Sequence, residues 1–178
     1  MFAIVLAALD RSGSVLPILC AMAVHELAHI VMMLACGGQG RRLTLRFADL
    51  QIAASGLGYR QELLSALAGP LVNLICGAAF CMQRPSFAAY SLMLGIYNLL
   101  PVWPLDGGRM IRCVLLARLP ITQAEHISEI VSFAACAVLL LIGVFLTFFR
   151  KSGLWPLGTA AYLTVRLLML ARRTDAVQ

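Results

Sequence analysis

The chain has 178 residues, of which 61% are hydrophobic and 12% charged, with a mean hydropathy of +0.90. A soluble domain of this size cannot bury that much apolar surface, so the composition excludes an ordinary soluble protein and predicts a polytopic membrane protein. The formal net charge of +6 would suggest nucleic acid in a soluble chain, but here the arginines lie between apolar runs, where such residues fix membrane topology.

The first long apolar run, residues 14–36, predicts a transmembrane helix that carries the motif HELAH. His25 and His29 lie one turn apart on such a helix and face the same way, so both imidazoles can bind one metal ion. Glu26 lies next to His25, where it can take a proton from water at the metal rather than bind the metal itself. Ionisable residues are costly in lipid, so the motif predicts a functional site. The alternative is a structural role, in which these side chains hydrogen-bond to neighbouring helices.

The next segment has the periodicity of a β-strand. In residues 41–47 (RRLTLRF), apolar and polar side chains alternate. The alternation breaks at Ala48-Asp49, and residues 50–55 (LQIAAS) can form a returning strand. We therefore expect a small membrane-associated β-hairpin between the first two spans.

Further apolar runs complete the predicted fold. They comprise residues 63–82 (which Gly69-Pro70 interrupts), 87–100, 130–149 and 154–171, and a shorter stub lies at residues 1–9. We predict an all-α polytopic membrane protein with about five to six transmembrane segments and the small hairpin. Because no repeat or appended soluble domain is visible, residues 1–178 are expected to form a single membrane core domain.

A broken segment follows the third run. Pro101 and Pro104 end that run, and the Gly-Gly pair after Asp106 lets the backbone turn before a new helix begins. Such backbone survives at membrane depth only where protein or a water-filled cavity satisfies it. Asp106 is therefore well placed to complete a site of two histidines and one aspartate. Its alternative roles are a helix cap or an ion pair with Arg109.

Three ordered motifs carry a resemblance to a known family. HELAH in the first span, AGPLVN (residues 68–73) in the next and NLLPVWPLDGGR (residues 98–109) after it together resemble the site-2 protease family of intramembrane zinc metalloproteases. The last motif looks most like the branch that contains the sporulation stage IV protease. The resemblance implies that His25, His29 and Asp106 bind one zinc ion per chain and that Glu26 is the catalytic base. It also implies that four further residues line or shape the active-site region, namely Asn98, Asn73, Gly69 and Pro70.

This sequence differs from the pattern of the family in two ways. The first helix of the family is reduced here to residues 1–9, and the nucleotide-sensing domain often fused to this branch is not seen. We expect these departures to affect regulation rather than chemistry.

Two features bear on how a substrate is held. The amide of Asn98 can donate to a carbonyl or an oxyanion, or it can cap the backbone that Pro101 frees. The strand at residues 41–47 can offer an edge on which an unwound substrate docks by β-augmentation, or it can belong to a simple interfacial hairpin.

These observations predict an intramembrane zinc metalloprotease that hydrolyses a peptide bond within or near a transmembrane segment of a membrane-associated protein. The resemblance implies a substrate such as a sigma-factor or anti-sigma precursor. Regulatory membrane partners are expected, whereas nucleic acid and a soluble small-molecule substrate are not. The arginines favour an orientation in which the end of the first span faces the cytoplasm. The resemblance implies a multi-pass protein of the bacterial cytoplasmic membrane with its active site toward the cytoplasm. Two alternatives stay open, a metal or ion transporter and an inactive scaffold that binds client helices.

Overall fold

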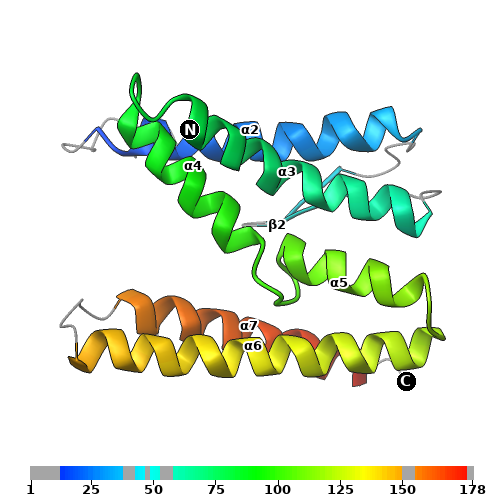
Figure 1. Ribbon diagram of the computed structural model, residues 1–178. Coiled ribbons are helices and arrows are strands. Elements are labelled where there is room, and N and C mark those ends of the chain that lie inside the picture. The colour runs from blue at the N-terminus through cyan, green and yellow to red at the C-terminus, as the bar shows by residue number, and fades with distance from the viewer. Residues whose placement is uncertain (1–12, 38–42, 47–48, 53–57, 150–154, 176–178) are drawn as a thin grey trace. The chain divides into compact units, whose positions relative to one another are not determined.

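The computed structural model describes residues 13–37, 43–46, 49–52, 58–149 and 155–175, in two compact units that divide at Leu99 and Leu100 (Figure 1). The first unit contains α2 (Val15–Ala35), β1 (Leu43–Arg46), β2 (Asp49–Ile52), α3 (Tyr59–Ala79) and α4 (Pro85–Asn98). The second contains α5 (Asp106–Leu116), α6 (Ile121–Phe149) and α7 (Trp155–Asp175). The stub at residues 1–9 lies outside the described residues. A single core domain over residues 1–178 stays a prediction.

In the first unit, α3 packs against both α2 and α4 (Figure 1). Near the end of α2, the Gln61 side-chain amide donates a 2.9 Å hydrogen bond to the carbonyl oxygen of Cys36. On the other side of α3, a Cβ atom added to Gly95 would lie only 3.0 Å from the carbonyl oxygen of Pro70. Lipid supplies no hydrophobic drive for helices to associate, so glycines that let backbones approach closely are an important source of packing energy.

The helix α3 runs unbroken through Pro70, so the predicted interruption at Gly69-Pro70 is wrong. A proline inside a helix removes one backbone donor and crowds the preceding turn, but packing against neighbouring helices in a membrane bundle can offset this. The Pro70 ring is fully buried, and the small residues Ala66, Ala68 and Gly69 before it are buried as well. Contacts between helices, which the local sequence does not reveal, therefore hold α3 together.

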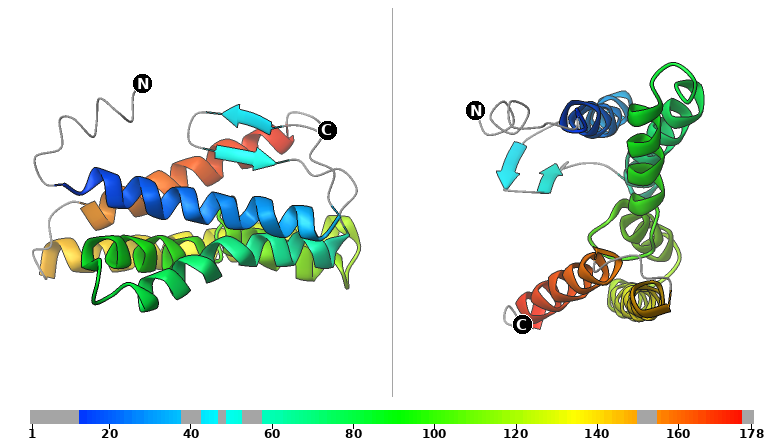
Figure 2. Two further views of the ribbon diagram at one scale, coloured as in Figure 1. Left: turned by 90° about the horizontal axis from the view of Figure 1, so that it is seen from above. Right: turned by 90° about the vertical axis from the view of Figure 1, so that its left-hand side faces the viewer.

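The strands β1 and β2 pair antiparallel, with Leu43 opposite Ile52 and Arg46 opposite Asp49 (Figure 2). β1 lies within residues 41–47, whereas β2 begins at Asp49, one residue before the predicted returning strand at residues 50–55. The residues between the two strands lie outside the described part of the chain. Association of this strand pair with the membrane stays a prediction.

In the second unit, the segment before α5 is packed directly against that helix. A Cβ atom added to Gly108 would lie 2.5 Å from the backbone nitrogen of Trp103 and 2.6 Å from the carbonyl oxygen of Val102. The backbone N–H of Trp103 also donates to the hydroxyl of Ser132 on α6 at 3.0 Å. That hydroxyl in turn donates to the carbonyl oxygen of Ser128 at 2.8 Å. The bend that begins α5 is therefore fixed by contacts with both α5 and α6.

Three helices in the described part of the chain are long and apolar enough to cross a membrane, namely Val15–Ala35, Tyr59–Ala79 and Ile121–Phe148. A shorter apolar stretch, Leu157–Met169, lies in α7, and α4 has 14 residues. Large apolar side chains on these helices are exposed, including Leu27 at 58% and Leu141 at 71%. Such exposure suits lipid rather than water, so the predominantly helical structure is that of a membrane protein.

Substituting Gly108 by alanine should destabilise the second unit. The added methyl group would overlap the backbone of Val102 and Trp103, and overpacking of this kind costs about 1–3 kcal/mol. Gly158→Ala is the matched control, because it is also a helical glycine but has nothing within 4 Å of the added carbon. Thermal unfolding in detergent should show a lowered midpoint for Gly108→Ala alone. Equal midpoints for the two variants would contradict the packing described here.

Candidate metal centre

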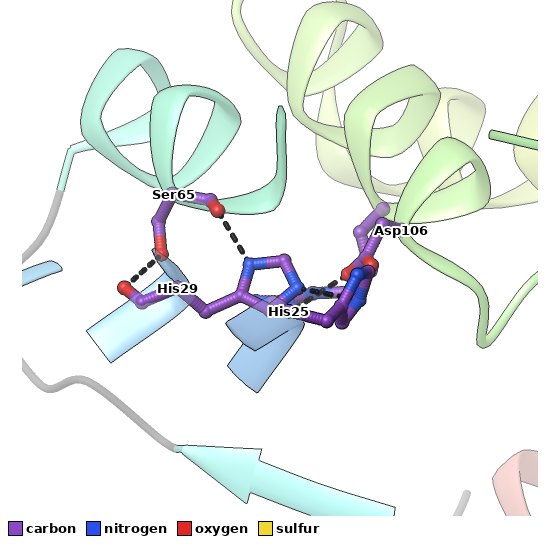
Figure 3. A network of polar contacts seen from close by, with 5 residues as sticks. His25, His29, Ser65 and Asp106 are labelled. Carbon is purple, nitrogen blue, oxygen red and sulfur yellow. Dashed lines mark hydrogen bonds and ion pairs between the residues drawn. The ribbon is translucent and has the colours of Figure 1, made fainter. Parts of the chain in front are cut away.

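His29 is held by the neighbouring helix α3. Its Nδ1–H donates a 2.6 Å hydrogen bond to the carbonyl oxygen of Ser65, and the Ser65 hydroxyl donates to the carbonyl oxygen of His29 at 3.4 Å (Figure 3). A carbonyl oxygen can only accept, so Nδ1 carries the proton of the neutral ring. The Nε2 atom of His29 is therefore left with a lone pair, which is the form that binds a metal ion.

The second imidazole faces this lone pair. Nε2 of His25 lies 3.1 Å from Nε2 of His29, and the ring centroids are 4.7 Å apart with an interplanar angle of 83°. Two nitrogens that bind one tetrahedral zinc ion, each about 2.0–2.1 Å from it, lie roughly 3.3 Å apart. Both side chains are buried, with exposed fractions of 5% and 7%. The donor atoms, their spacing and their burial therefore fit a zinc ion.

Gly69 provides the room that the two imidazoles occupy. A Cβ atom added to this residue would overlap Nε2 of His29 and lie 2.9 Å from Cε1 of His25. A side chain at this position would thus occupy the space in which the two rings meet. The glycine of the AGPLVN motif lets α3 pack directly over the histidine pair.

Ser65 could not be identified from the sequence, because its contact with His29 uses a backbone carbonyl that carries no signal there. A weaker signal does exist on α3. Ser65, Gly69 and Asn73 recur every fourth residue, so they share one face of this helix. All three are buried, and Asn73 reaches Nδ1 of His25 at 3.2 Å. This face of α3 is the wall against which the two imidazoles pack.

Glu26 and Asn98 lie in the first unit but in different settings. Glu26 follows His25 on α2 and is half-buried, unlike the two buried histidines. Asn98 is the last residue of α4, and its Nδ2 donates to the carbonyl oxygen of Leu94 at 3.0 Å. This hydrogen bond goes to a carbonyl within α4 and uses only one of the two amide hydrogens, so both alternatives for Asn98 stay predictions.

Asp106 is the first residue of α5, in the second unit. The capping position is Leu105, so the helix-cap alternative for Asp106 is not what the structure shows. The ion-pair alternative is present, because Nη1 of Arg109 donates to Oδ1 of Asp106 at 3.4 Å. The Asp106 side chain is buried, with an exposed fraction of 7%. A buried carboxylate at the start of a helix also benefits from the positive end of the helix dipole.

Comparison with known proteins supports the resemblance that the motifs indicate. The model of peptidase family M50 matches residues 85–142. The zinc metalloprotease MJ0392 of Methanocaldococcus jannaschii is 25% identical over 134 residues, which are 68% of this chain and 40% of that protein. Stage IV sporulation protein FB of Bacillus subtilis is 28% identical over 138 residues, which are 70% of this chain and 47% of that protein. The chain thus spans less than half the length of these relatives.

The fold comparison agrees. The site-2 protease from Methanocaldococcus jannaschii superposes with a TM-score of 0.67 at 19% identity, covering 94% of this chain and 83% of that one. This similarity shows a shared fold. Together with the sequence matches, it confirms the predicted resemblance to the site-2 protease family, peptidase family M50. The roles of the individual residues stay predictions.

Replacing Gly69 with alanine should disturb the histidine pair. Because the added methyl group would occupy the space of the His29 ring, we expect zinc affinity to fall by at least about tenfold, the loss typical when the support of a ligand is removed. Competition with a chelator on the purified protein measures this. Gly158→Ala, whose added carbon meets nothing, should bind zinc like the wild type. Unchanged zinc affinity in Gly69→Ala would show that the two imidazole rings can move away from the added methyl group and still bind zinc.

Proposed function

We propose that this protein is an intramembrane zinc metalloprotease that hydrolyses a peptide bond within or near a transmembrane segment of a membrane-associated protein. The observation that carries the proposal is the buried pair of imidazole Nε2 atoms, 3.1 Å apart, on an apolar helix long enough to cross a membrane. A buried ionisable cluster on such a helix is by default functional. One of the matched relatives is named as a zinc metalloprotease, which supports the same reaction.

The proposed zinc ligands are His25, His29 and Asp106. His25 and His29 are buried on α2 in the first unit, and Asp106 is a buried carboxylate at the start of α5 in the second. Two imidazoles and one carboxylate are a ligand set typical of catalytic zinc, which keeps a fourth position open. We propose one zinc ion per chain. Asp106, at the start of α5, would be the ligand that the second unit contributes.

Glu26 is the proposed general base. A bound zinc ion would polarise the peptide carbonyl and make water acidic enough to lose a proton near neutral pH. The carboxylate of Glu26, one residue from a ligand and only half-buried, can take that proton and return it to the leaving amine. The second amide hydrogen of Asn98 can donate to the carbonyl oxygen of the substrate. Gly69, Pro70 and Asn73 would shape the site by keeping α3 close to the imidazoles.

The finer features of the membrane arrangement belong to the same proposal. We expect five or six transmembrane segments, with α4 and α7 contributing beside the three long apolar helices. The arginines favour a site that opens toward the cytoplasm in a bacterial membrane. The strand pair would offer an edge to an unwound substrate, and a sigma-factor or anti-sigma precursor is the kind of substrate we propose. Regulatory membrane partners would control access.

Glu26→Gln should keep one zinc ion per chain but lower cleavage by at least about 100-fold, because an amide cannot accept the proton of the attacking water. Co-expression with candidate single-span membrane proteins, followed by a search for truncated products, measures cleavage. Glu62→Gln, which changes another half-buried glutamate of the first unit, should cleave normally. Residual activity near the wild-type level in Glu26→Gln would refute the base role. If the wild type transports zinc but cleaves nothing, and Glu26→Gln loses that transport, the transporter alternative is favoured. If the wild type binds client helices but does not cleave them, the scaffold alternative is favoured.

Asp106→Asn should bind much less than one zinc ion per chain, because a neutral amide is a poor zinc ligand where a carboxylate is expected. Arg109→Gln is the matched control, because it breaks the same ion pair but leaves the carboxylate in place. Metal analysis of the purified proteins should find wild-type zinc in Arg109→Gln and a loss in Asp106→Asn that approaches the loss in His29→Phe. If both control and test variant keep zinc, Asp106 serves the ion pair alone and the third ligand lies elsewhere.

A further inference from the structure

The side chain of Asn73 makes one contact that the proposed chemistry does not yet use. Asn73 is on α3, is completely buried, and places its Nδ2 atom 3.2 Å from Nδ1 of His25. The other end of the same amide, Oδ1, is buried without a hydrogen-bond partner. Buried polar atoms are nearly always paired, so an unpaired carbonyl oxygen beside a candidate ligand suggests a second hydrogen-bonding arrangement.

The hydrogen bonds of the two rings define the arrangement seen in the structure. Since Nε2 of His29 carries a lone pair, the 3.1 Å contact between the rings requires Nε2–H on His25. A neutral imidazole has one N–H, so Nδ1 of His25 is then an acceptor. This agrees with Asn73, whose Nδ2 donates to it.

Binding of a metal through Nε2 of His25 requires the opposite arrangement. Nε2 then needs its lone pair, so the single N–H of the ring moves to Nδ1 and needs an acceptor there. The oxygen and nitrogen of an asparagine amide fill nearly the same space, and a half-turn about the Cβ–Cγ bond exchanges them. That half-turn presents Oδ1 to Nδ1–H without any movement of α3.

We propose that Asn73 is a positioning residue for His25, whose amide oxygen accepts Nδ1–H and thereby fixes the ring with the Nε2 lone pair toward the metal. This proposal rests on the proposed function. The Asn73 oxygen would accept a hydrogen bond from Nδ1–H of His25, as the Ser65 carbonyl oxygen does for His29, with one difference. A backbone carbonyl accepts in every arrangement, whereas an amide serves His25 both as the donor seen here and as the acceptor that metal binding requires.

Two substitutions at this position separate an acceptor from a filler of space. Asn73→Asp keeps the acceptor and loses the donor, whereas Asn73→Leu has a similar size and loses both. We expect Asn73→Asp to bind zinc at least as tightly as wild type, and Asn73→Leu to bind it about 10–100-fold more weakly, the range for lost support of a metal ligand. Affinity is measured by competition with a chelator, with thermal unfolding in detergent as the check on folding.

A spectroscopic readout tests ring orientation directly. In the cobalt-loaded protein, the visible absorption bands should shift in Asn73→Leu and be nearly those of wild type in Asn73→Asp. Ser91→Ala is the control, because Ser91 is also completely buried, on the neighbouring helix α4, with an unpaired hydroxyl. It should leave both affinity and bands unchanged. Asn73→Ala replaces the leucine variant if the latter does not fold.

The outcomes are distinct. Equal losses in Asn73→Asp and Asn73→Leu would overturn the proposal, since they would mean that the donor or the shape of the amide matters. Wild-type zinc binding in Asn73→Leu would overturn it as well, while leaving the proposed function intact. Failure of wild type and Ser91→Ala to bind zinc would refute the proposed function itself, and the positioning role with it.

Discussion

A polar group that a membrane helix carries into lipid has to find its hydrogen-bond partner within the protein, and this constraint governs the first unit. His25 and His29 could not lie on an apolar helix without partners. The structure pairs His29 with the Ser65 carbonyl and His25 with the Asn73 amide, both on α3. Each contact uses Nδ1, so both Nε2 atoms are turned toward one point. The demand for satisfied polar groups thus also orients the candidate ligands.

These hydrogen bonds require unusually close helix packing, which the small residues of α3 permit. Gly69 leaves space for the imidazoles on the side of α2, and Gly77 leaves space for Leu92 on the side of α4. Gly95 of α4 brings the two backbones together in the same way. Glycine costs helix stability in water, where Ala is better by about 1 kcal/mol. In a bundle held by contacts between backbones, each of these glycines has a specific packing role.

The sequence alone predicted the apolar helices from their hydrophobic runs, although α6 begins at Ile121 rather than at residue 130, and it predicted the histidine pair from local spacing. His25 and His29 are four residues apart, and helical geometry then fixes which way they face. It could not predict what each ring contacts, since Ser65 is 36 residues from His29 and acts through its backbone. The predicted break at Pro70 failed for the same reason. Local preference disfavours proline in a helix, but interhelical packing around a completely buried ring decides the outcome.

Asp106 illustrates the opposite case, in which broken backbone is itself the signal. Two prolines and a pair of glycines around one aspartate predicted a turn that presents a carboxylate, and α5 does begin at that residue. What the sequence could not show is how the turn is fixed. A serine hydroxyl on α6 receives the Trp103 N–H, and Gly108 lets the preceding backbone lie directly against the helix.

Exposure separates the proposed roles within one turn of α2. The two histidines are 5% and 7% exposed, whereas Glu26 between them is only half-buried. A metal ligand gains from a dry setting, in which its orientation is fixed and competing water is excluded. A general base has the opposite need, because it has to reach water and release the proton that it takes. Successive positions on a helix point about 100° apart, so a single turn can meet both needs. The HELAH spacing therefore places two buried imidazoles, the proposed ligands, beside a less buried carboxylate, the proposed base, on one apolar helix.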